Sequence, residues 1–524
     1  MPKWLNDAVF YEIYPQSFYD TNGDGIGDIP GIIEKLDYIK DLGCNALWIN
    51  PCYDSPFKDA GYDVRDYKKV ASRYGTNEDL YELFRVAHQK GIHVLIDLVP
   101  GHTSEEHEWF RESCKPEKNE YSDRYIWTDF WIKGTPGHPY IGGECDRNGT
   151  YMLNFFKCQP ALNYGFFNPT ESWQTSYKDP AAVATQDAMI DVMRFWLDRG
   201  CDGFRVDMAD SLVKDDDKDK TGTCSIWQRI RKMLDTDYPE AALVAEWSNP
   251  WQAIASAGFH MDFYLDHGGN GYNTLLRDYE TPGGDNSFFK KNANGDIGRF
   301  LKDFLPRYEI SRGKGYVSFI TCNHDTPRAT NTLDESELKL AYATLLTLPG
   351  VPFIYYGDEI GMKYIADMPT KEGGYTRTGT RTPMQWSEGP NKGFSDASPD
   401  MLYLPVDANG PSVESESARP DSLYNTVKTL LKLKNANEDL KADADFKVIL
   451  GIPGHPFVYQ RGSMTIAVNS ETRPATLDIT GLIRGKSDQI SQAGSPDKIV
   501  FSVGDPSFNA GKLELPAQSF AILL

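Results

Sequence analysis

The sequence lacks any uninterrupted apolar run of about 20 residues, so no membrane-spanning helix is expected. It also lacks an excess of positive charge: 54 Lys and Arg stand against 75 Asp and Glu, and the net charge is −21. A surface of this sign repels phosphate backbones and anionic lipid, so we expect no binding to nucleic acid or to a membrane. An uncharged ligand is compatible with this charge.

Cysteine is also scarce, and its spacing excludes the common metal motifs. The eight cysteines are scattered over 524 residues, and no Cys-x-x-Cys pair is present. Cys114, Cys145 and Cys158 fall within one loop-rich region, where a disulfide between two of them is one interpretation.

The first residues lack the apolar segment of a signal peptide. We therefore expect a cytoplasmic protein, or a secreted one whose signal peptide is not part of this sequence. Internal repeats and low-complexity tracts are absent too. The oligomeric state is unknown from the sequence.

What the sequence does contain is a regular alternation of short, β-rich apolar runs with longer helix-periodic ones. The eight short runs are 8–14, 46–50, 93–99, 203–207, 242–246, 261–265, 317–321 and 352–356, and helical candidates include 32–42, 78–90, 185–198 and 338–347. Such alternation predicts βαβ units and a parallel sheet. Eight units over about 350 residues favour an α/β fold of the closed (β/α)8 TIM-barrel type.

Two regions depart from this rhythm. About 80 residues rich in aromatics, Gly, Pro and Asn separate the third run from the next helix, which indicates a small inserted domain. A second insertion-like stretch covers 371–413. Beyond about residue 440, short β-like runs separated by turn residues predict an antiparallel β-sandwich. We therefore divide the chain into a barrel (1–103 and 179–440), an inserted domain (104–178) and a C-terminal domain (441–524).

Carboxylates follow several of the predicted strands. Asp207 ends the fourth run, Glu246 ends the fifth, and Asp325 lies after the seventh. Because strand ends meet at one face of a barrel, we expect these side chains to lie together. Cleavage of a glycosidic bond requires an acid on the leaving oxygen and a carboxylate that meets the oxocarbenium-like carbon. The pattern therefore indicates this reaction.

Three further side chains accompany these acids. Arg205 lies two residues before Asp207 and is expected on the same side of the strand, where its charge can keep that carboxyl group ionised. His102 and His324 follow other strands and can donate hydrogen bonds to sugar hydroxyl groups.

The four strand-end segments that hold these residues resemble the signature regions of glycoside hydrolase family 13, the α-amylase family, and the segment 159–163 is similar to its additional signature. The resemblance covers nearly the whole chain. It implies that Asp207 is the nucleophile, Glu246 the general acid/base and Asp325 a stabiliser of the transition state. It also implies that Arg205, His102 and His324 support the sugar at subsite −1.

Two more segments are similar to those of oligo-1,6-glucosidases, α-glucosidases and trehalose synthases. One contains Asp59 and Tyr62, and the other begins at Arg381. The resemblance implies that Asp59 and Arg381 form a salt bridge that binds terminal sugar hydroxyl groups, and that Tyr62 stacks on the −1 ring. These residues would form a wall at one side of the site, which predicts a pocket that accepts the end of a sugar chain. A structural ion pair is the alternative.

The segment 20–28 presents oxygen side chains at alternating positions with glycines between them. This pattern resembles a calcium loop, and related family members carry Ca²⁺ there. The expected ligands of this structural ion are the side chains of Asp20, Asn22, Asp24 and Asp28 and the carbonyl of Ile26. The alternative is a cluster of Asx turns without metal.

The resemblance has two departures that matter for function. Gly101 stands where the family usually has Asn, which weakens the case for a second calcium between barrel and insertion. Met208 follows the nucleophile and matches neither the α-1,6 nor the α-1,4 pattern, so linkage preference is open.

We expect a retaining, exo-acting α-glucosidase for short malto- or isomalto-oligosaccharides, which are neutral substrates. The alternatives are a transglucosylase or trehalose-synthase-like isomerase, an endo-acting α-amylase, and a non-enzymatic carbohydrate-binding relative.

Overall fold

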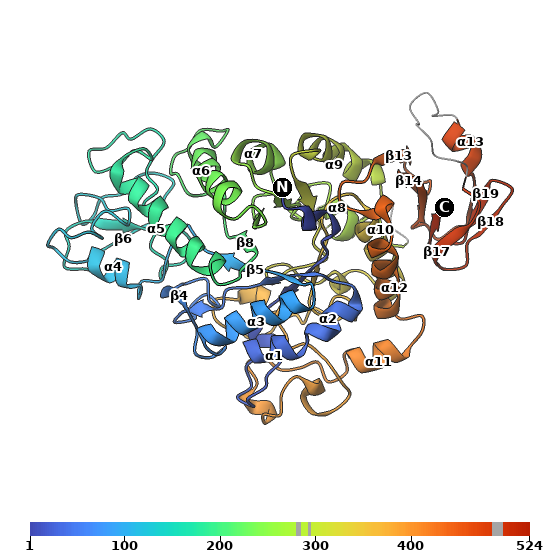
Figure 1. The fold of residues 1–524 in the computed structure, drawn as a ribbon, viewed down its shortest axis with the longest axis horizontal. Helices are drawn as coiled ribbons and strands as arrows, with labels where there is room; N and C mark the ends of the chain where they lie inside the picture. The colour runs from blue at the N-terminus through green and yellow to red at the C-terminus, as the bar shows by residue number, and fades with distance from the viewer. Residues whose placement is uncertain (279–283, 292–294, 485–495) are drawn as a thin grey trace.

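A computed structural model describes residues 1–278, 284–291, 295–484 and 496–524 (Figure 1). Its centre is a sheet of eight parallel strands in the order β11-β10-β9-β8-β5-β2-β1-β12. The strands are β1 (Phe10–Ile13), β2 (Ala46–Ile49), β5 (His93–Leu98), β8 (Gly203–Val206), β9 (Ala242–Ala245), β10 (Met261–Phe263), β11 (Tyr316–Ser318) and β12 (Phe353–Tyr355). A parallel bridge between Ile320 and Phe353 brings the two edge strands together. The barrel is therefore nearly closed, and the predicted fold is confirmed.

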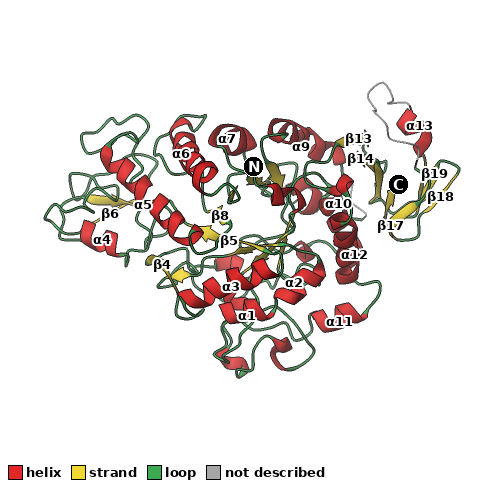
Figure 2. Cartoon of the chain, viewed as in Figure 1, coloured by secondary structure: helices red, strands yellow, loops and turns green. Residues whose placement is uncertain are grey.

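Helices cover the outside of the barrel (Figures 1 and 2). They include α1 (Ile29–Glu34), α2 (Leu36–Leu42), α3 (Asn77–Gln89), α5 (Pro180–Leu197), α6 (Thr221–Asp237), α7 (Pro250–Gln252), α8 (Asn273–Leu276), α9 (Ile297–Ser311), α10 (Glu335–Thr347), α11 (Val413–Ala418) and α12 (Leu423–Asn435). Strands β1, β2, β8 and β9 are buried at every position, as a helix-covered parallel sheet requires. Among the described residues, no helix combines the length and apolarity needed to cross a membrane.

Several predicted helix limits were wrong, and capping explains the differences. The single helix expected at 32–42 is two helices that meet at Lys35. The first of them, α1, starts at Ile29 because the N-cap residue Asp28 accepts a hydrogen bond from the Gly31 amide. Helix α5 starts at Pro180, since proline suits a first helical turn. Helix α10 starts early because Asp334 forms a capping box.

The inserted segment between β5 and α5 lies at one end of the molecule (Figure 1). It contains α4 (Glu108–Ser113) and the hairpin of β6 (Tyr140–Gly142) and β7 (Thr150–Met152). Ile126, Met152, Ala161 and Phe166 form a small core of its own. An antiparallel bridge between His102 and Ala161 joins this segment to the end of β5. The insertion therefore stands directly over the strand ends.

The C-terminal region lies at the opposite end (Figure 1). Its five-stranded antiparallel sheet contains β13 (Phe446–Leu450), β14 (Phe457–Arg461), β15 (Met464–Asn469), β20 (Ser519–Leu523) and β17 (Ile499–Val503), and its three-stranded sheet contains β16 (Ala475–Asp478), β19 (Lys512–Leu515) and β18 (Ser507–Asn509). A short helix, α13 (Ile479–Arg484), follows β16. Val458 and Leu513 belong to one apolar cluster between the sheets. The predicted antiparallel domain is confirmed.

Irregular segments carry the rest of the barrel mouth. The short hairpin of β3 (Tyr53–Asp54) and β4 (Asp66–Val70) follows β2 and holds the loop with Asp59 and Tyr62. After β12, a long segment runs through the 3-10 helices η5 (Tyr375–Thr380), η6 (Pro390–Gly393) and η7 (Pro399–Met401) (Figure 2). Both segments supply side chains to the site.

Candidate active site

The centre of the site is one buried arginine that contacts three carboxylates. Arg205 on β8 is 1% exposed. Its Nη1 lies 2.8 Å from Oδ1 of Asp97 and 3.2 Å from Oδ1 of Asp207, and its Nη2 lies 2.8 Å from Oε2 of Glu246. Because these acids end β5, β8 and β9, neighbouring strands bring them to one cation. The prediction that Arg205, Asp207 and Glu246 lie together is confirmed.

The electrostatics of Asp207 come from its burial and its neighbours. Burial and the nearby Glu246 carboxylate raise the pKa of Asp207 well above its usual value, and Arg205 opposes this rise. The Asp207 amide donates to the Leu98 carbonyl, and the Met208 amide donates to Oε2 of Glu246 at 2.9 Å. The backbone of Met208 has a φ of 41°, an unusual value for a residue other than glycine. The turn after β8 thus orients both acids.

Asp325 lies in a strongly cationic environment. His324 Nε2 is 3.2 Å from its Oδ2, and Arg377 Nη1 and Arg381 Nη2 are each 2.9 Å from its Oδ1. Although burial favours the protonated acid, His324 and the two arginines lower the pKa of Asp325 well below its usual range. Asp325 is therefore a fixed negative charge that faces the site.

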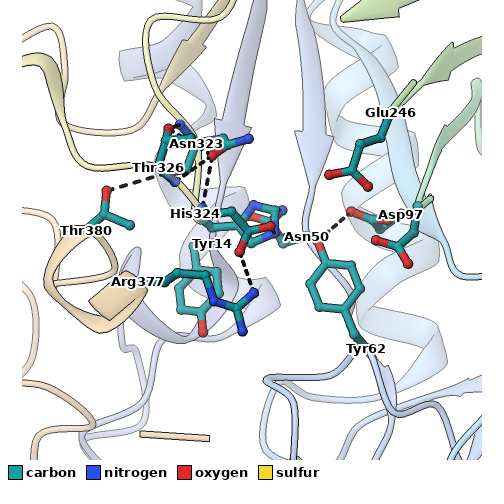
Figure 3. A network of polar contacts seen from close by, with 12 residues as sticks. Tyr14, Asn50, Tyr62, Asp97, Glu246, Asn323, His324, Thr326, Arg377 and Thr380 are labelled. Carbon is teal, nitrogen blue, oxygen red and sulfur yellow. Dashed lines mark hydrogen bonds and ion pairs between the residues drawn. The ribbon is translucent and has the colours of Figure 1, made fainter. Parts of the chain in front are cut away.

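His324 is held between two acids and the ring of Tyr62. Its Nδ1 lies 3.0 Å from Oε1 of Glu12 on β1, and it stacks on Tyr62 with ring centroids 5.4 Å apart. Burial opposes its charge, but Asp325 and Glu12 raise the pKa of His324 to about 9. The Tyr62 hydroxyl lies 2.7 Å from His324 Nε2 and donates to Asp97 at 3.1 Å. Figure 3 shows Tyr62 between Glu246 and Asp97 on one side and Arg377 on the other.

The predicted partner of Asp59 was wrong. Arg381 donates instead to the His324 carbonyl and to Asp325, and it is 2% exposed. The cation beside Asp59 is Arg377, four residues earlier, whose Nη2 lies 3.6 Å from Asp59 Oδ1. Gln159 of the inserted segment donates to Asp59 Oδ2 at 2.7 Å. Burial raises the pKa of Asp59 to about 6.

Asp59 retains unused hydrogen-bonding capacity. Its Oδ1 is a buried acceptor without a hydrogen-bond partner among the described residues. Buried polar atoms normally find such a partner. A ligand hydroxyl group in the pocket would satisfy it.

His102 has partners on both ring nitrogens. Its Nε2 lies 3.1 Å from the Tyr62 carbonyl, and the Asn154 amide lies 3.0 Å from its Nδ1. These partners assign the tautomer with the proton on Nε2. Burial lowers the pKa of His102 to about 3, so the ring is neutral. Its predicted contact with sugar hydroxyl groups stays a prediction.

The position of the Asn154 side chain depends on Gly101, the residue that departs from the family pattern. A Cβ atom on Gly101 would lie 2.8 Å from Asn154 Nδ2. The Oδ1 of Asn154 accepts from Lys214 Nζ at 3.1 Å, and Lys214 also donates to the Ser211 carbonyl. Burial lowers the pKa of Lys214 to about 8. A lysine from the barrel thus holds the insertion against His102.

These residues surround a pocket of about 350 Å³. Its lining is Asp59, Tyr62, His102, Phe155, Asp207, Met208, Asp210, Glu246, Trp247, Leu265, His267, Asp325 and Arg377. Ligand pockets span about 300–1,000 Å³, so this one has the size for a small ligand. Arg205, His324 and Arg381 stand behind the lining. All nine predicted catalytic and substrate-binding residues therefore belong to one site.

The predicted calcium loop lies apart from this pocket. Asp20 donates its amide hydrogen to the Phe394 carbonyl, and its Oδ2 accepts from Ser395 Oγ at 2.6 Å. The side-chain oxygens of Asp20, Asn22, Asp24 and Asp28 also accept from loop amides. This is the arrangement of consecutive Asx turns. Both oxygens of Asp20 already accept two hydrogen bonds, whereas Oδ1 of Asn22 and Oδ1 of Asp24 accept one each. An all-oxygen donor set suits Ca²⁺, and the ion stays a prediction.

Sequence reasoning missed Arg377, Asn154 and Lys214. The sequence signal for Arg377 was its position four residues before Arg381, but this did not show which of the two arginines lies beside Asp59. Asn154 and Lys214 had no comparable signal, since each acts through a contact between segments that are 60 residues apart.

The comparisons with known proteins agree with this geometry. Residues 12–443 match the family model described as "Alpha amylase, catalytic domain". The chain belongs to the α-amylase family of glycoside hydrolases. It is 35% identical to trehalose synthase/amylase TreS of Mycolicibacterium smegmatis, over 83% of this chain and 77% of that protein. It is 33% identical to oligo-1,6-glucosidase of Heyndrickxia coagulans, over 88% and 89% of the two chains.

Solved structures of the family share the fold. A mutant of MutB, a trehalulose synthase from Pseudomonas mesoacidophila MX-45, in complex with sucrose, superimposes with a TM-score of 0.80. Its sequence is 25% identical, and the match covers 100% of this chain and 99% of that one. This chain is accordingly a glycoside hydrolase of the same family.

Proposed function

We propose that this α-amylase family member is a retaining, exo-acting α-glucosidase that hydrolyses short malto- or isomalto-oligosaccharides through a covalent glucosyl-enzyme. The observation that carries the proposal is the pair of Asp207 and Glu246 on one guanidinium group at the floor of a small pocket. Retaining glycosidases use two carboxyl groups about 5–5.5 Å apart, one as nucleophile and one as acid/base.

The proposed reaction has two steps. In the first, an Asp207 oxygen attacks the anomeric carbon while protonated Glu246 gives its proton to the leaving oxygen, and the glycosidic bond breaks. In the second, Glu246 takes a proton from water, and the water oxygen attacks the same carbon and releases Asp207. Arg205 contacts both acids and favours ionised Asp207.

Asp325 and its neighbours would hold the sugar. The cations around Asp325 keep it ionised, so it can accept from sugar hydroxyl groups. Asp59 and Arg377 form the wall next to it. Because this wall stands beside the catalytic pair, the pocket suits the end of a chain better than its interior. A neutral ligand fits, since the pocket lining is mainly acidic and aromatic.

The second candidate keeps the first step and replaces water by a sugar hydroxyl group. It is favoured by the 35% identity to a protein named trehalose synthase/amylase. Trp247, Leu265 and His267 also line the pocket and would bind the acceptor sugar in this case. A transglucosylase or an isomerase of the trehalose-synthase kind would then use the same catalytic residues. The remaining candidates are an endo-acting α-amylase and a non-enzymatic carbohydrate-binding protein.

A product profile separates these candidates. The enzyme is incubated with maltose, isomaltose, trehalose, sucrose and soluble starch, and products are followed by chromatography and proton NMR. Glucose released first as the α-anomer supports the proposal. New disaccharides from maltose favour transfer or isomerisation, long products from starch favour endo action, and a first product in the β-configuration excludes the retaining mechanism.

We also propose that the loop with Asp20, Asn22, Asp24, Ile26 and Asp28 binds a structural Ca²⁺. Its oxygen ligands suit a hard cation, and Asp20 ties the loop to the segment after β12. The ion would stabilise this contact and take no part in the reaction.

A further inference from the structure

A pair of cysteines in the inserted segment stands apart from the other cysteines of the chain. Cys114 follows α4 directly, and Cys145 lies in the turn between β6 and β7. Their sulfur atoms lie 2.7 Å apart, although 31 positions separate them in sequence. Both are free thiols in the structure. Two thiols held this close need little rearrangement to form a bond.

The backbone around the two sulfur atoms is fixed independently of them. The Arg147 amide donates to the Cys114 carbonyl at 3.1 Å. The Arg147 guanidinium donates to the Ser113 carbonyl at 3.0 Å and lies 4.6 Å from the centroid of the Trp127 ring. The turn with Cys145 is therefore held against the end of α4. A stable approach of both chain segments is the main geometric requirement for a disulfide.

Access to solvent also distinguishes this pair. Cys114 and Cys145 are partly exposed, whereas the other six cysteines are buried. A surface depression of about 410 Å³ is lined by both sulfur-bearing residues together with Phe110 and Tyr151. A small molecule can therefore reach this pair.

The two thiols differ in acidity, and Cys145 is the more acidic one. The hydrogen bond between them lowers the pKa of Cys145 and raises that of Cys114. By contrast, burial raises the pKa of Cys158 to about 12. The thiolate is the reactive form of cysteine, so Cys145 is the better nucleophile of the pair.

We propose that Cys114 and Cys145 are a redox modification site that forms an intramolecular disulfide by exchange with a small-molecule disulfide. The Cys145 thiolate attacks one sulfur of the reagent, whose sulfur–sulfur bond breaks and releases one thiolate. Cys114, after losing its proton, then attacks the Cys145 sulfur of the mixed disulfide and releases the second reagent thiolate. The two cysteines lose two electrons and two protons, and the reagent is reduced to two thiols.

The bond would fix the side of the active-site pocket that the inserted segment forms. Strand β7 runs directly into Asn154 and Phe155, and α4 follows the segment that holds His102. The disulfide therefore closes a loop between two segments that meet at the His102 ring. Closing a loop of this length restricts the unfolded chain, so the oxidised protein should be the more stable form.

The experiment counts free thiols in the full-length protein. The protein is incubated with oxidised or reduced glutathione and alkylated under denaturing conditions. Its mass is then measured by mass spectrometry, both for the intact protein and for its peptides. We expect eight labels after reduction and six after oxidation, with Cys114 and Cys145 peptides linked. The oxidised protein should show a Tm higher by several degrees. Reduced glutathione should reverse both changes.

Two variants make the test specific. In Cys145→Ser the loss of two labels and the rise in Tm should disappear, whereas Cys158→Ser, a buried cysteine of the same segment, should still lose two labels. Eight labels in the oxidised wild type, or a linkage between other cysteines, would overturn the proposal. If a variant fails to fold, the peptide map of the oxidised wild type still shows whether Cys114 and Cys145 are linked.

Discussion

The floor and the wall of the pocket differ in how they are built. The floor consists of Asp207, Glu246 and Arg205, which end adjacent strands or lie within them and contact one another directly. The wall consists of Asp59 and Arg377, which come from two irregular segments. Strand geometry dictates the floor, whereas the wall depends on how long segments fold over the barrel. The floor should therefore govern the chemical step, and the wall should govern binding.

The largest expected effect comes from the floor. Asp207→Asn removes the proposed nucleophile, so kcat should fall by about 10³-fold or more, with KM little changed. Hydrolysis of p-nitrophenyl α-glucoside measures both constants. The control is Asp210→Asn, which alters another carboxylate of the pocket lining that does not contact Arg205. Its kcat should fall less than about tenfold. Near-normal hydrolysis by Asp207→Asn would end the assignment.

Removal of Arg377, which belongs to the wall, and of Arg381, which lies behind it, should have different effects. Arg377→Ala removes the wall cation, and loss of one charge-assisted hydrogen bond from it to the sugar, worth about 1.5–3 kcal/mol, should lower kcat/KM about 10–100-fold through KM. Its Tm should stay nearly unchanged, because Arg377 is partly exposed.

Arg381→Ala supplies the contrast. It breaks a buried ion pair, which typically costs about 3–5 kcal/mol of stability, so its Tm should fall clearly. Arg377→Lys should recover only part of the binding, since lysine lacks the planar fork of arginine. Equal effects of the two alanine variants on Tm would contradict the distinction.

Protonation of Asp59 should weaken the wall in acid. The pKa of Asp59 is raised to about 6 by burial, so the carboxylate is present above pH 6 and lost as the pH falls through that value. KM should therefore rise about tenfold between pH 7 and pH 5, since each pH unit below the pKa reduces the ionised fraction tenfold. Asp59→Asn should show a high KM that no longer varies over this range.

The contact between insertion and barrel should produce a smaller change. Gly101→Ala places a Cβ atom 2.8 Å from Asn154 Nδ2 and should displace this amide from His102. We expect kcat/KM to fall about tenfold, the size of one lost hydrogen bond of about 1.4 kcal/mol. Asn154→Ala removes the same contact without the clash and should give a similar loss. A tenfold difference between the two variants would indicate a separate role for the backbone at Gly101.

The smallest effect should follow removal of the proposed calcium. Chelation with EDTA should lower Tm by about 1–2 °C, equivalent to about 1–2 kcal/mol for a chain of this length, while kcat at 25 °C stays unchanged. Added Ca²⁺ should restore Tm, and Asp24→Ala should be insensitive to both treatments. Indifference of the wild type to EDTA and to Ca²⁺ would favour the loop as a set of Asx turns without metal.

The sequence predicted the parts of the molecule that follow from local pattern. The eight strands and the acids at their ends were predictable, because burial on both faces leaves continuous apolar runs that stop at the site. Helix starts were less predictable, because Pro180 and Asp334 lie outside the apolar periodicity: Pro180 occupies the first turn of α5, and Asp334 caps α10. The partner of Asp59 was not predictable in this way, since only the fold of a 3-10 segment decides between Arg377 and Arg381.

Trapping the glucosyl-enzyme tests the central proposal most directly. A 5-fluoro-α-glucosyl fluoride, which slows the second step, is added to the wild type and to Glu246→Gln, and the peptides are analysed by mass spectrometry. We predict one glucosyl adduct, on the peptide that contains Asp207, and it should accumulate further in the variant. An adduct on another residue, or no adduct together with a first product of inverted configuration, would contradict the proposed nucleophile.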